Sequence, residues 1–148
     1  MTPQLRATPL SDGRPRIAYR AGYKYQLAET YEIDTQILRY CVSSEWLSLD
    51  GAGHLVIRAG YAWDGASGPA ADTASIMRGS LVHDALYQLI RLGLIDHRYK
   101  RLADDILRAC CLRDGMNRVF AWATWTAVDK CADGATRPEA ERPIIYAP

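Results

Sequence analysis

One short stretch of the chain carries more chemistry than any other, His83-Asp84-Ala85-Leu86-Tyr87. It joins a base that titrates near neutral pH, a carboxylate and a phenol. A second carboxylate, Asp104, comes twenty-one residues after the histidine, and a glycine-rich turn at residues 63–69 precedes both. A histidine that takes a proton from water, beside oxygen atoms that hold a cation, suits a hydrolytic reaction. These residues therefore predict a metal-assisted hydrolytic site.

The apolar residues that follow Thr73 recur with a helical period, which places this motif on a helix. With about 100° of rotation per residue, His83 and Tyr87 lie one turn apart on one side of that helix, and Asp84 lies beside them. Leu86 and Ile90 fall on the near side of His83. We therefore expect the imidazole at the border of the core, where the surroundings shift a pKa.

A second predicted helix, residues 98–111, carries two adjacent aspartates, of which only one can face the first helix. Its apolar residues share one direction; Asp104 lies roughly 110° from the centre of that direction, and Asp105 lies roughly 150° away on the opposite side. We therefore predict that Asp104 orients one ring nitrogen of His83, so that the other nitrogen accepts a proton from water. Asp105 is expected to be solvated or to cap the helix.

The metal ligand predicted from the motif is Asp84. Calcium takes six to eight oxygen ligands at flexible geometry, and Asp64 and Gly65 belong to a turn that offers a carboxylate and backbone carbonyls. Zinc is less favoured, because the sequence has neither an HExxH motif nor a cluster of cysteines. The expected cofactor is calcium, bound through Asp84, Asp64 and Gly65.

Taken singly, each of these features has a more common structural explanation. A His-Asp pair is most often a buried histidine beside a surface aspartate, an Asp-Gly turn most often joins a strand to a helix, and Tyr87 alone is most often a core residue. Their joint occurrence on two helices favours the functional interpretation.

Composition limits the other classes of function. The chain has 148 residues, of which 49% are hydrophobic, and we expect one domain over residues 1–148. The net charge of +1 and the absence of a lysine- or arginine-rich run argue against a nucleic-acid partner. We find no signal peptide and no apolar run that could span a bilayer. The four cysteines are expected to be free thiols, with Cys110 in the core.

The elements that must position the site form two halves. Residues 1–15 are expected to form an extended arm, residues 16–60 to be mainly β, residues 73–131 to be helical and residues 134–148 to form an irregular, exposed tail. The β half contains four runs with strand composition, residues 23–27, 36–42, 45–49 and 54–58, and an Asp-Gly turn joins the last two into a hairpin. Gly93 is expected to end the first helix and Asn117 to cap a third. Strands followed by helices indicate an α+β fold with small antiparallel sheets.

Roughly half of the chain resembles the DUF1353 family of phage and prophage proteins. The resemblance rests on an ordered set of segments, residues 55–67, His83-Asp84-Ala85-Leu86-Tyr87, Arg101-Leu102-Ala103-Asp104 and Ala127-Val128. It implies a phage context, with the protein in the cytoplasm of the bacterial host or in the virion, and phage particle proteins as partners.

The helical half is also similar to prokaryotic secreted phospholipase A2. In that family a His-Asp-x-x-Tyr helix is paired with a helix that bears an aspartate twenty-one residues after the histidine. The resemblance implies a three-helix arrangement in which His83 is the general base, Asp104 orients it, Tyr87 supports it by a hydrogen bond and Asp84 binds calcium. Position 80, a cysteine in those lipases, is Ser80 here.

Two main hypotheses follow. The first is a phage-encoded hydrolase similar to phospholipase A2, in which His83 activates water to cleave a phospholipid or another ester. The second is a structural or accessory protein of the phage tail or particle, in which the same residues form a buried polar cluster without catalysis. A metal-dependent hydrolase of a peptide or cell-wall bond is a third.

Overall fold

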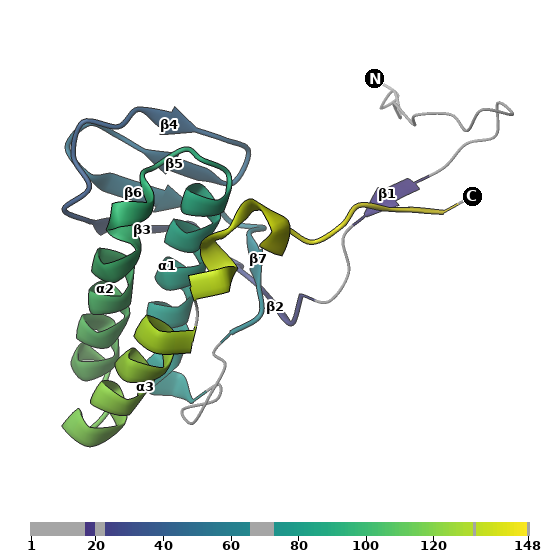
Figure 1. Ribbon diagram of the computed structural model, residues 1–148. Coiled ribbons are helices and arrows are strands. Elements are labelled where there is room, and N and C mark those ends of the chain that lie inside the picture. Colours follow the sequence, from purple (N-terminus) through teal and green to yellow (C-terminus); the bar gives the residue numbers. More distant parts are fainter. Residues whose placement is uncertain (1–16, 20–22, 66–72, 132, 148) are drawn as a thin grey trace, which may run out of the picture.

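The computed structural model describes residues 17–19, 23–65, 73–131 and 133–147. Small antiparallel sheets come first along the chain and three helices follow, so the predicted α+β fold is confirmed (Figure 1). The predicted arm at residues 1–15 lies outside the described residues.

A four-stranded antiparallel sheet covers one side of the helices. Its strands lie in the order β3 (Tyr31–Asp34), β6 (His54–Ile57), β5 (Leu47–Leu49) and β4 (Val42–Ser43). The predicted hairpin is confirmed, because β5 and β6 pair directly across the turn at residues 50–53. Its inner face carries four side chains that are almost completely buried, Leu47, Leu49, Leu55 and Ile57.

The prediction of a strand at residues 36–42 is wrong except at Val42, which begins β4. The hydroxyl of Thr35 donates a hydrogen bond to the carbonyl of Gly53 and accepts one from the backbone N–H of Ile37, and this local bonding competes with strand pairing. Arg39 then turns the chain with a φ of 69°. The strand beside β6 is instead β3, which the sequence analysis did not identify. Ile37 is fully buried from within this loop.

The three predicted helices are α1 (Ala74–Arg91), α2 (Lys100–Arg113) and α3 (Arg118–Cys131). The predicted stop is confirmed, since Gly93 has a φ of 70° and its N–H bonds to the carbonyl of Ile90. The predicted cap of α3 is confirmed as well, because the side chain of Asn117 accepts a hydrogen bond from the N–H of Phe120 at 2.9 Å. A short 3-10 turn, η1 (His97–Tyr99), leads into α2.

Helix α1 is the central element of the molecule. The sheet packs on one side of it through Val82, Leu86 and Leu89, which share a core cluster with the inner face of the sheet. Helix α2 packs on another side, where Gly79 faces Leu107 so closely that an added Cβ would lie 2.9 Å from a methyl group of Leu107. Polar residues of α1 are therefore buried along with apolar ones, including Ser80 and His83.

Helix α3 lies across the pair formed by α1 and α2 (Figure 1). Its inner side buries Ala121 in a small cluster with Ile76 and Leu107, whereas Phe120 and Trp122 on its outer side are about half exposed. Trp122 is thus a surface residue. No helix within the described ranges combines the length and the apolar character needed to cross a membrane.

The prediction of an irregular, exposed tail is only partly right. Residues 133–147 form two 3-10 turns, η2 (Asp133–Thr136) and η3 (Pro138–Ala140), and a strand, β8 (Ile145–Ala147), which pairs with β1 (Ile17–Tyr19). Figure 1 shows the two turns lying beside α1. Arg91 and His97 hold this segment by hydrogen bonds to the carbonyl of Ala135 and the hydroxyl of Thr136. These long-range contacts order a segment whose composition indicates a loop.

Candidate active site

The helix pair brings His83 and Asp104 into direct contact, as the sequence analysis predicted. Nε2 of His83 lies 2.8 Å from Oδ1 of Asp104. Asp104 is completely buried, and the His83 side chain is 8% exposed. Asp105 instead faces outward and accepts a hydrogen bond from the indole of Trp125. Helical phase therefore identified the correct aspartate.

Two more donors converge on the Asp104 carboxylate. The hydroxyl of Tyr87 donates to Oδ1 at 2.6 Å, and Nζ of Lys100 donates to Oδ2 at 3.0 Å. An ionised carboxylate only accepts hydrogen bonds, so Nε2 of His83 must carry the proton of the neutral ring. The other ring nitrogen, Nδ1, is then the one with a free lone pair.

Burial and hydrogen bonding act in opposite directions on this pair. Burial alone lowers the pKa of His83, but the hydrogen bond to Asp104 and the interaction with Asp84 outweigh it, so the pKa lies above its usual value. Burial alone raises the pKa of Asp104, but hydrogen bonds from His83, Tyr87 and Lys100 hold it below its usual value. The lowered pKa keeps Asp104 an anion, and the raised pKa favours the protonated form of His83 beside it.

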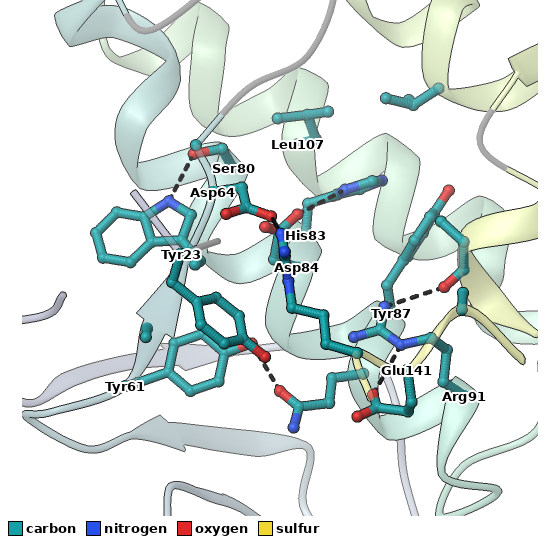
Figure 2. A pocket seen from close by; sticks show the side chains of 18 of the residues that line it. Tyr23, Tyr61, Asp64, Ser80, His83, Asp84, Tyr87, Arg91, Leu107 and Glu141 are labelled. Atoms are coloured by element: carbon teal, nitrogen blue, oxygen red, sulfur yellow. Dashed lines mark hydrogen bonds and ion pairs between the residues drawn. The ribbon is translucent and has the colours of Figure 1, made fainter. Parts of the chain in front are cut away.

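The Nδ1 edge of His83 faces a cavity. This nitrogen lies 3.8 Å from a carboxylate oxygen of Asp84, and both residues line a cavity of about 640 Å³. Figure 2 shows His83, Asp84 and Asp64 gathered around this space, with Glu141 and Arg91 on another side. The cavity is large enough to enclose a small organic substrate. A base with a free lone pair therefore borders a ligand-sized space.

An aromatic wall faces the helix side of the cavity. Tyr61 and Trp63 come from the segment around β7 (Ala62–Trp63), which pairs with β2 (Tyr25–Gln26). Both are tied to α1, since Tyr61 donates a hydrogen bond to the side chain of Gln88 and Trp63 donates one to the hydroxyl of Ser80. Further apolar lining comes from the helices, through Ile76, Leu107 and Val128.

The C-terminal segment supplies the remaining wall, a feature that the sequence analysis missed. Glu141 accepts a hydrogen bond from Arg91 at 2.9 Å, and Arg142 forms an ion pair with Asp64. The guanidinium of Arg142 also lies over the ring of Tyr23, 4.7 Å from its centroid. No local pattern could reveal these partners, because Arg142 and Asp64 are 78 residues apart.

The predicted metal ligands are brought to the same cavity, since Asp84, Asp64 and Gly65 all line it. One of the two carboxylates, that of Asp64, forms an ion pair with Arg142. The rest of the turn, from residue 66 to residue 69, lies outside the described residues. Within the described part of the chain, no three histidine, cysteine, aspartate or glutamate side chains are grouped so that they could hold a metal ion. The carboxylate of Asp84 lies instead beside Nδ1 of His83.

Lys100 is the other important residue that the sequence analysis missed. It stands four residues before Asp104 on the same helix, a spacing at which oppositely charged side chains meet. That signal is present in the sequence, where it marks Asp104 as a carboxylate with a positively charged neighbour on its own helix.

Comparison of the sequence with protein-family models found no matching family, and comparisons with curated proteins and with solved structures found no match. A function for this chain is therefore inferred from the geometry of the site.

Proposed function

We propose that the chain is a hydrolase of the phospholipase A2 type, in which His83 activates water to cleave an ester. The observation that carries the proposal is that the two ring nitrogens of His83 have different surroundings. Its Nε2 edge is held by a buried anion, and its Nδ1 edge faces a cavity of about 640 Å³. A histidine oriented in this way has the arrangement of a general base.

The chain's own residues account for the proton transfers. Nδ1 of His83 takes a proton from water as the water oxygen attacks the ester carbonyl, and the imidazolium returns that proton to the leaving alcohol. Asp104 stabilises the transient positive charge without itself taking a proton. The apolar side chains of Ile76 and Leu107 line the same cavity and suit an acyl group. A phospholipid is one ester of this class.

The second candidate is an accessory protein of a phage particle, and one observation favours it. Lys100 also donates to the carbonyls of Val128 and Asp129, so the polar cluster links all three helices. Such a fully bonded cluster stiffens a helical core without performing a reaction.

Substitution of His83 by glutamine separates the two candidates. Glutamine places an amide donor near the position of Nε2 and so preserves a hydrogen bond to Asp104, but it removes the base. We expect ester hydrolysis to fall by about 100-fold or more, with the melting temperature within a few degrees of the wild type. The assay uses p-nitrophenyl acyl esters and phosphatidylglycerol vesicles. His54→Asn is the matched control, because His54 lies on the outer face of the sheet beside Asp34 and Glu32.

Calcium is tested with the same preparations. If Asp84 binds calcium, the ion raises the melting temperature and the hydrolysis rate of the wild type, and Asp84→Asn loses both effects. A wild type that hydrolyses no ester with calcium, zinc or chelator, together with a His83→Gln variant that unfolds, would establish the structural candidate instead.

A further inference from the structure

Lys100 is buried at the centre of the helical half. Its side chain is 10% exposed, and its ammonium group contacts Oδ2 of Asp104 at 3.0 Å and the carbonyls of Val128 and Asp129 at 3.3 Å each. The ring of Tyr87 lies 5.9 Å from the nitrogen. Lysines are almost never buried unless they are paired. This ammonium group therefore has a specific partner, and that partner is the carboxylate that orients His83.

The two carboxylate oxygen atoms of Asp104 accept hydrogen bonds from different residues. Oδ1 accepts from His83 and Tyr87, both on α1, whereas within the described residues Oδ2 accepts from Lys100 alone. The terminal torsion of an aspartate has a broad, nearly two-fold energy profile, so one bonded oxygen does not define the plane of the carboxylate. The ammonium group anchors the second oxygen and fixes that plane.

We propose that Lys100 is a positioning residue of the candidate active site, which holds the Asp104 carboxylate so that Oδ1 is presented to the Nε2–H of His83. The catalytic consequence rests on the proposed hydrolytic function, but the effect on the imidazole does not. The fixed carboxylate selects one tautomer of His83 and leaves Nδ1 as the nitrogen that faces the cavity.

Three substitutions test this positioning role. Lys100→Met keeps the aliphatic stem and removes both donor and charge, Lys100→Gln keeps a donor without the charge, and Lys100→Arg keeps both. The matched control is Arg101→Met, which removes a positive charge from the next position of α2, where the side chain is 65% exposed and contacts Asp129.

The readout is the 15N NMR signal of the His83 ring, assigned by its loss in His83→Gln. In the wild type we expect well-separated signals for a protonated Nε2 and an unprotonated Nδ1. In Lys100→Met the two signals move toward each other, because the carboxylate no longer selects one tautomer of the ring. Lys100→Gln, Lys100→Arg and Arg101→Met keep the separation.

The measurement does not depend on turnover. If the protein hydrolyses esters, Lys100→Met lowers kcat more than it raises KM. If it hydrolyses none, the ring signals still test the positioning role. A folded Lys100→Met variant with the tautomer of the wild type overturns the proposal. Should that variant not fold, a Lys100→Gln variant in which the two signals converge although a donor is kept overturns it equally.

Discussion

At the scale of single residues, Asp104 is the side chain on which the site depends. It is fully buried, and it accepts hydrogen bonds from an imidazole, a phenol and an ammonium group. Three donors around two oxygen atoms offset the cost of removing the carboxylate from water. The same arrangement makes the residue intolerant of even a small chemical change.

Replacement of Asp104 by asparagine should therefore be costly. The amide is neutral and carries its own donors, so the buried Lys100 loses its counter-charge. We expect the free energy of unfolding to fall by about 3–5 kcal/mol, measured by urea denaturation. Asp105→Asn is the matched control, because its amide oxygen still accepts from Trp125 at the surface. Equal losses in the two variants would contradict the argument.

Helical phase alone is sufficient to choose between these two aspartates. Rotation along α2 depends only on residue spacing, so the direction of each side chain relative to the apolar stripe can be read from the sequence. The partners of Asp64 cannot be read in this way. Arg142 reaches it from the other end of the chain, and its contact depends on how the tail folds back over α1.

At the scale of elements, the close approach of α1 and α2 brings the dyad together. Gly79 stands one turn before His83 on the side that faces α2, and an added Cβ would lie 3.1 Å from the backbone oxygen of Leu107 and 3.3 Å from Cβ of Cys110. A backbone atom yields less readily than a flexible side chain. The glycine thus sets the distance at which the two helices pack.

Gly79→Ala should for this reason destabilise the protein although alanine is the better helix former. Helix propensity favours alanine by about 1 kcal/mol, whereas overpacking against α2 costs about 1–3 kcal/mol. We expect a net loss of stability in urea denaturation and a weaker protection of the His83 ring from solvent. Gly51→Ala is the control, because a Cβ there meets nothing within 4 Å. A Gly79→Ala variant that is more stable than the wild type would contradict this prediction, because it would show that α1 and α2 can move apart without a loss of free energy.

Elements that rely on local signals were predicted well. The hairpin, the helix stop at Gly93 and the cap at Asn117 follow from turn and capping chemistry, which acts over a few residues. The strand expected at residues 36–42 failed because Thr35 bonds to the hairpin turn and Arg39 turns the chain. Residues 133–147 gave no local signal, since long-range contacts to α1 and η1 determine their structure.

At the scale of the whole molecule, the buried pair makes stability depend on pH in two directions. Asp104 has a lowered pKa, so its contribution is present above its usual value of 3.8 and is lost as the pH falls through the lower folded value. His83 has a raised pKa, so its contribution is present below its usual value of 6.5 and is lost as the pH rises through the higher folded value. Stability from this pair is therefore greatest between these two limits.

Thermal denaturation across this range provides the check. We expect the melting temperature to fall on the alkaline side of the plateau in the wild type and to fall less in His83→Gln. Each unit by which the pKa of His83 is raised corresponds to about 1.4 kcal/mol. The pKa of His54 is raised as well, by hydrogen bonds to Asp34 and Glu32. The His54→Asn variant therefore shows how much of the alkaline fall in melting temperature comes from His54. If the alkaline fall in melting temperature disappears in His54→Asn and persists in His83→Gln, it is caused by His54 and the prediction for His83 is wrong.

The link from Lys100 to the carbonyls of α3 has a consequence for how the chain unfolds. An intermediate in which α3 has detached would leave the ammonium group without two of its acceptors while Asp104 is still enclosed between α1 and α2. Such an intermediate carries a poorly satisfied charge and is disfavoured, so the three helices lose their protection together. In hydrogen exchange, the slowest amides of α1, α2 and α3 are then expected to share one opening free energy.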